Sequence, residues 1–69
     1  MNNANAKNIE AKNLQVIKDQ LEHEALMNKK YNEYSTQCTD TSIKTLCSEA
    51  SQIHKQNFQG LKSYLDSHQ

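Results

Sequence analysis

The sequence predicts an all-α fold, an antiparallel two-helix hairpin that dimerises into a four-helix bundle. The 69 residues include no proline and one glycine, so almost nothing interrupts a long helix. Two long stretches carry apolar residues at three- and four-residue steps, and a short polar cluster separates them. Only 35% of the residues are apolar, against about 45–50% in ordinary soluble domains. A chain this short and polar is expected to gain further burial by oligomerisation.

The first helix is expected over about residues 8–37, after an asparagine-rich N-terminus (1–7) that we expect to be frayed. Leu14, Ile17, Leu21 and Tyr31 share one helical face, and charged residues occupy the opposite face. Glu24 breaks this pattern because it falls in the middle of the apolar stripe. A carboxylate on a packing face must be paired, protonated, bound to a metal or raised to solvent.

The second helix is expected over about residues 41–66, so that residues 8–69 form one helical domain. Short polar side chains at 35–40 interrupt the first helix, and Asp40 is a suitable N-cap for the next. Residues at helical spacing then form a second apolar stripe: Ile43, Leu46, Cys47, Ala50, Ile53, Phe58, Leu61, Tyr64 and Leu65. Each helix therefore has a stripe wide enough to contact more than one neighbour. Two copies related by a twofold axis would bury both stripes.

Several classes of partner and location are disfavoured by composition. Net charge is zero and there is no arginine, so nucleic acid is not an expected partner. No run of about 18 apolar residues is present, so no membrane span is expected. The N-terminus lacks the apolar core of a signal peptide, which predicts cytoplasmic synthesis. Cys38 and Cys47 would lie about 13 Å apart along a helix, so we expect two free thiols or a crosslink between chains through Cys38.

The candidate site residues are Glu24 and His54. Folding the hairpin about residues 38–39 places Glu24 about 14 residues before the turn and His54 about 15 after it, at nearly the same height. Asn28 and Asn57 are within about a turn of this layer. Three interpretations stay open: a site for iron, manganese or zinc, a buried hydrogen-bond network that fixes the dimer register, or polar residues solvated by water.

Catalysis is not expected from this sequence. Cys47 and His54 are about two helical turns apart, too far for a nucleophile and its base. The chain also has no glycine-rich phosphate loop and no Ser-His-Asp pattern. We therefore expect no enzymatic activity and no required cofactor.

Glu24 is followed seven residues later by Tyr31-Asn32, then by a short polar loop and a second helix that contains His54. In this pattern the chain resembles the spore coat protein F type, a ferritin-like helical family of spore-forming bacteria. The similarity spans most of residues 14–65. The resemblance implies a ferritin-like helical hairpin, a location in the spore coat, and contacts with other coat proteins.

The ferritin-like group implied by this resemblance holds two metal ions with Glu on one helix and Glu-x-x-His on the next. Glu24 matches the first element and His54 the last, but Ser51 stands where the second Glu is expected. The first hypothesis is thus a non-catalytic structural or interaction protein of the spore coat. The alternative is a small metal-binding or redox protein that uses Glu24 and His54 across a homodimer.

Overall fold

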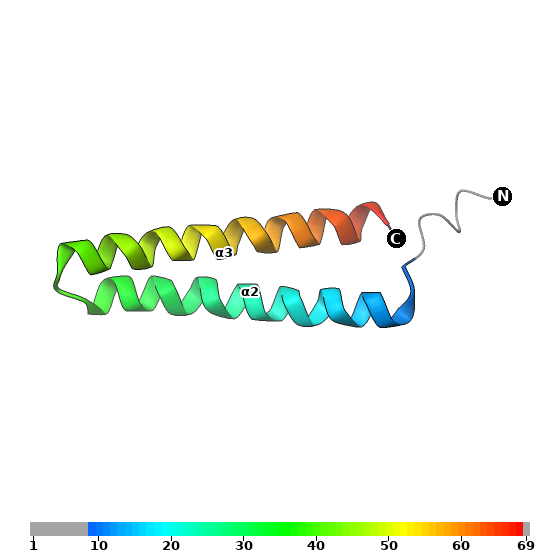
Figure 1. The fold of residues 1–69 in the computed structure, drawn as a ribbon, viewed down its shortest axis with the longest axis horizontal. Coiled ribbons are helices and arrows are strands. Elements are labelled where there is room, and N and C mark those ends of the chain that lie inside the picture. Colours follow the sequence, from blue (N-terminus) through cyan, green and yellow to red (C-terminus); the bar gives the residue numbers. More distant parts are fainter. Residues whose placement is uncertain (1–8, 69) are drawn as a thin grey trace.

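The computed structural model describes residues 9–68 as two antiparallel helices, α2 (Ala11–Gln37) and α3 (Thr41–Ser67), joined by a three-residue connection (Figure 1). The predicted helical hairpin is confirmed. The first helix begins three residues later than predicted, because the Glu10 carbonyl accepts the first helical bond from the Leu14 N–H at 2.8 Å. The second helix ends one residue later than predicted, and the N-terminus 1–7 lies outside the described residues. Within residues 9–68 no helix is long and apolar enough to cross a membrane.

Hydrogen bonds at both helix ends hold the turn. Asp40 is the N-cap of α3, as predicted, and its carboxylate accepts the Ile43 N–H at 3.0 Å. At the end of α2 the Cys38 N–H donates to the Tyr34 carbonyl at 3.0 Å. The Lys44 ammonium donates to the Ser35 carbonyl at 2.8 Å, which ties the start of α3 to the last turn of α2.

The two helices face each other along a seam whose residues alternate three- and four-residue steps, the spacing of a coiled coil. Near the termini the seam is apolar, whereas from its middle to the turn it is mostly polar or small. Its partly or fully buried residues are Leu14, Ile17, Leu21, Glu24, Asn28, Tyr31 and Ser35 on α2 with its C-cap Cys38, and Lys44, Cys47, Ser51, His54, Phe58, Leu61 and Leu65 on α3 with its C-cap His68.

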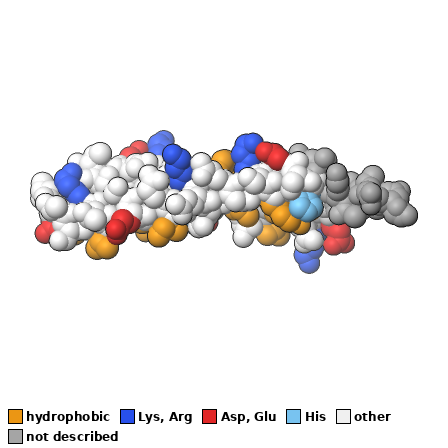
Figure 2. All heavy atoms as spheres, turned by 90° about the horizontal axis from the view of Figure 1, so that it is seen from above, with side chains coloured by type: hydrophobic (Ala, Val, Ile, Leu, Met, Phe, Trp, Pro, Cys, Tyr) orange, Lys and Arg blue, Asp and Glu red, His pale blue; other side chains and the backbone are white. Residues whose placement is uncertain are grey.

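The apolar stripe expected on the second helix is divided in two by the structure. Cys47, Phe58, Leu61 and Leu65 lie in the seam. The other apolar residues belong to an outer stripe. Each outer-stripe residue comes directly before a seam residue of α3 in the sequence, and so lies about 100° from it round the helix. Hydrophobic side chains gather along one long edge of the molecule in Figure 2. The outer stripe of α3 is Ile43, Leu46, Ala50, Ile53, Asn57, Gly60 and Tyr64.

Part of α2 lies on the same face as this outer stripe. One open hollow on the surface is lined by Val16 together with Tyr64, and a second by Gln20 together with Gly60. Among the described residues no hydrophobic side chain is buried, and seven large ones are 41–64% exposed. The hairpin therefore leaves much apolar surface in water.

Candidate functional site

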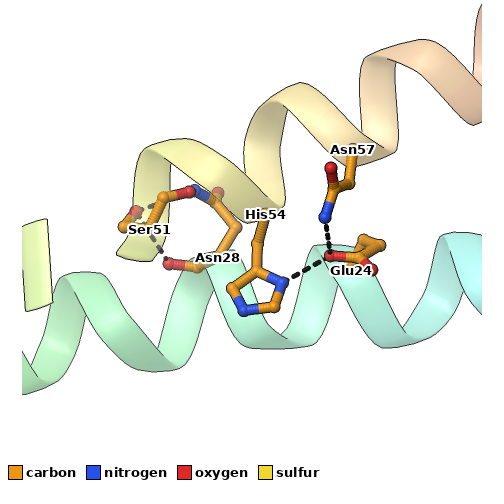
Figure 3. A network of polar contacts seen from close by, with 5 residues as sticks. All are labelled: Glu24, Asn28, Ser51, His54 and Asn57. Carbon is orange, nitrogen blue, oxygen red and sulfur yellow. Dashed lines mark hydrogen bonds and ion pairs between the residues drawn. The ribbon is translucent and has the colours of Figure 1, made fainter. Parts of the chain in front are cut away.

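A polar cluster occupies the middle of the seam (Figure 3). α2 contributes Glu24 and Asn28, which are separated by one helical turn. α3 contributes Ser51 and His54 from the seam and Asn57 from the outer stripe. The same three- and four-residue spacing that brings leucines together near the termini brings these polar side chains together here.

Asn28 and Ser51 form the most enclosed part of the cluster. The Asn28 amide donates to both the backbone carbonyl and the hydroxyl oxygen of Ser51, each at 2.8 Å. The Ser51 hydroxyl donates in turn to the Asn28 carbonyl at 3.2 Å. Ser51 has no exposed surface, and no buried side-chain N or O atom within residues 9–68 lacks a hydrogen-bond partner. Such a fully satisfied polar pair favours one alignment of the helices, because a shift would leave its groups unpaired.

Glu24 and His54 form the second part of the cluster. The Nδ1 atom of His54 is bonded to the Oε1 atom of Glu24, and the Asn57 amide donates to the same oxygen at 3.4 Å. The side chains of Glu24 and His54 are 15% and 23% exposed, so water reaches both. This contact is an ion pair when the imidazole is protonated.

The environment of Glu24 favours its charged form. The hydrogen bond from His54 lowers the pKa of the Glu24 carboxyl below its ordinary value of 4.5, while partial burial acts in the opposite direction. The hydrogen bond from Asn57 and the nearby imidazoles of His54 and His23 lower this pKa further. Glu24 is therefore a carboxylate at neutral pH and an acceptor for its neighbours.

Two aromatic rings flank the His54 ring. Tyr31 lies parallel to it with ring centroids 5.6 Å apart and an interplanar angle of 7°. His23 approaches edge-on at 6.2 Å. These offset-stacked and edge-on contacts are the arrangements that aromatic pairs prefer, and they accompany the bond from Nδ1 to Glu24.

The structure brings Glu24 and His54 into contact, as expected from their equal heights. Asn57 joins them, but Asn28 pairs with Ser51 one turn nearer the connection. The apolar pattern does not mark Ser51 as a packing residue, although it is the one fully buried side chain among residues 9–68. A signal for it was present, because Asn28 is 11 residues before residue 39 and Ser51 is 12 after it, which places them at one height.

The arrangement is a poor fit to a metal centre. Within residues 9–68 no group of three or more His, Cys, Asp or Glu side chains is placed to hold a metal ion. Glu24 Oε1 is already an acceptor for His54 and Asn57. Transition-metal sites in helical bundles gather carboxylates and imidazoles from several helices, and one chain offers a single pair. What this geometry can do chemically is align two helices and bind a proton.

Three comparisons with known proteins found no match for this chain. No protein-family model matches the chain, and neither the curated proteins nor the solved structures contain a match.

Proposed function

We propose that this chain is a non-catalytic structural protein whose working unit is a homodimeric, ferritin-like four-helix bundle. The observation that carries the proposal is that residues 9–68 bury no hydrophobic side chain. A folded protein that works alone needs a core, and the seam between α2 and α3 does not supply one.

The energetics support a second copy as the missing part. Fully burying one large hydrophobic side chain stabilises a fold by about 1.5–3 kcal/mol. Leu46, the most exposed of the seven large hydrophobic residues, is 64% exposed, and Ile53 is 56% exposed. A domain of about 60 residues has little stability to spare, so leaving this surface in water is costly. A twofold pairing of hairpins would cover it.

The polar cluster fits a structural role within such a bundle. Its groups are engaged with one another, and they join α2 to α3 at defined heights. The resemblance to the spore coat protein F type supports placing this bundle in a spore coat, in contact with other coat proteins. There the dimer would serve as a rigid building block.

A metal-binding function is the weaker proposal. It would use Glu24 and His54 from both copies, and the contact between these two side chains is the observation in its favour. The single carboxylate per chain and its existing hydrogen bonds weigh against it.

Sedimentation equilibrium tests the proposal. We expect twice the chain mass at micromolar concentrations and a melting temperature that rises with protein concentration, as mass action requires for a dimer. Metal analysis of the untagged protein should find less than a tenth of an ion per chain. A folded, helical monomer would contradict the bundle. Stoichiometric metal that is lost in Glu24→Ala would favour the alternative function.

Location is tested separately. Immunodetection in fractionated spores of the source organism should find the chain in the coat fraction. Detection only in the soluble spore core would remove the coat assignment and leave the dimer unaffected.

A further inference from the structure

The outer stripe of α3 has a self-complementary order of large and small residues about its centre, Ile53. Gly60 is seven residues after Ile53 and Leu46 is seven before it. Tyr64 is eleven residues after Ile53, and Ile43 is ten residues before it. Asn57 is four residues after Ile53, and Ala50 is three residues before it. Two copies of α3 packed antiparallel would thus place Leu46 opposite Gly60, Ile53 opposite itself and Ile43 opposite Tyr64.

We infer that two copies of this chain dimerise through this face with α3 packed antiparallel against the partner's α3, and with Ile53 on the twofold axis. In this arrangement Gly60 receives the partner's Leu46, and Ile53 contacts the partner's Ile53. The inference rests on the proposed homodimer and specifies which of its possible arrangements is formed.

Gly60 supports this arrangement by the space around it. Among residues 9–68, a Cβ atom added at Gly60 would meet nothing within 4 Å, so no contact within this part of the chain accounts for the glycine. Glycine in the interior of a helix is unfavourable compared with alanine. A side chain from a second copy that fills this space would account for it, and Leu46 is the most exposed large hydrophobic residue available.

The α2 helix agrees with the same axis. Because Glu24 pairs with His54, residue 25 of α2 lies at the height of Ile53. Val16 is nine residues before that point and Tyr34 nine after it, and both are apolar and exposed. One twofold axis therefore pairs Val16 with the partner's Tyr34 while it pairs Ile53 with itself. Gln20 and Lys30 are five residues before and after residue 25, so the same axis places the polar Gln20 of one copy opposite the polar Lys30 of the other.

A twofold axis parallel to the helices is the alternative, and it places large and small side chains of the two copies opposite each other less well. It would pack α3 against the partner's α2, which places Leu46 at the height between Lys30 and Tyr34 of the partner. The most exposed apolar side chain would then lie between an ammonium group and a phenol ring. By the same count Gly60 would lie at the height between Val16 and Gln20 of the partner, so that Val16, a smaller side chain than Leu46, would face its space.

The size of the shared face is adequate for a stable dimer. Helices of 27 residues are about 40 Å long, and two side by side are about 20 Å wide, so the face offers about 800 Å². That is about what each partner contributes to a standard protein interface. The outer stripe runs through most of the length of α3.

Site-directed crosslinking tests the arrangement in the full chain. Ile53→Cys is made in a background of Cys38→Ser and Cys47→Ala, and is treated with a short bismaleimide. The matched control is Gln52→Cys, an exposed neighbour at almost the same height that lies off the proposed interface. We expect most of the Ile53→Cys chains to become covalent dimers and less than a tenth of the Gln52→Cys chains.

A second pair of variants tests the contact at Gly60. Gly60→Leu should weaken dimerisation about tenfold by crowding the partner's Leu46. Adding Leu46→Ala to it should restore the dimerisation constant to within about threefold of its original value. In a hairpin without this contact, Gly60→Leu would leave association unchanged.

The outcomes separate the two proposals. Dimeric mass with no preferential crosslinking of Ile53→Cys overturns the α3-to-α3 arrangement and leaves the homodimer standing. A folded monomer overturns both.

Discussion

The two halves of the seam differ in what fills them. Toward the termini, the seam holds partly buried leucine, isoleucine and phenylalanine side chains, including Leu21 and Phe58. Toward the turn, the seam holds Asn28, Ser51 and the ammonium group of Lys44. Apolar contacts are non-directional, so the first half supplies attraction without fixing an alignment. Hydrogen bonds are directional, so the second half fixes the alignment and contributes little hydrophobic burial.

The outer face shows the reverse distribution. Ile43, Leu46 and Ile53 lie on the turn half of α3, where the seam is polar, and all three are about half exposed or more. In the turn half, the large apolar residues of α3 therefore lie on the outer stripe and not in the seam with α2. The half nearest the termini is the more complete within one chain, and the half nearest the turn depends more on a second copy.

The largest expected effect comes from the apolar half. Leu21→Asp places a charge in the seam, where it has no partner, and should destabilise the fold by about 3 kcal/mol, comparable with the whole stability of so small a domain. Circular dichroism at 222 nm should show a largely unfolded chain. Gln52→Asp, an exposed position, should stay helical. Retention of helix by Leu21→Asp would show that this half does not hold the hairpin together.

In the polar half, Ser51→Leu should be the most damaging substitution. Ser51 has no free surface, so leucine crowds the seam and removes a hydrogen-bond partner of Asn28, at a combined cost of about 2–3 kcal/mol. Ser51→Ala is the matched control and should lose only about 1 kcal/mol. Urea titration measures both. A stabilised Ser51→Leu would mean that the helices can realign without the polar pair.

The pH dependence tests Glu24. Because its pKa is lower in the folded state, folding is favoured above the unfolded value and loses this contribution as pH falls through 4.5 and below. Thermal melts of the wild type should therefore lose stability more steeply between pH 5 and about pH 3 than those of Glu24→Gln, which has no titrating group there. Parallel acid profiles for the two proteins would show that the Glu24–His54 contact does not contribute to stability.

The smallest effect is expected at the turn. Lys44→Met keeps the length of the side chain but removes the bond to the Ser35 carbonyl, at a cost of about 0.5–1 kcal/mol. Lys62→Met is a suitable comparison, since Lys62 bonds to the exposed Asp66 one turn away on the same helix. That surface pair should contribute about 0.3–0.5 kcal/mol. Chemical denaturation should rank the two variants in this order, and equal losses would remove the proposed role of Lys44 at the turn.

The sequence by itself determined the two helices, their antiparallel arrangement and the turn. The absence of proline, the helical spacing and the cap at Asp40 are local properties, and each acts within a few residues. The equal height of Glu24 and His54 was also predictable, because height along a hairpin follows from the position of the turn and the rise per residue.

Only the tertiary structure decided which residues of the broad α3 stripe face α2. Ile53 and His54 are neighbours in sequence, and the apolar periodicity favours Ile53 for packing without showing which edge of the stripe faces α2. The structure turns His54 inward because Glu24 and Tyr31 lie opposite it, and Ile53 then lies about 100° away, facing solvent. The same rotation buries Ser51 and exposes Leu46. The backbone hydrogen bonds within a helix are the same at any rotation of the helix about its own axis. Packing against the side chains of the other helix therefore determines the rotation.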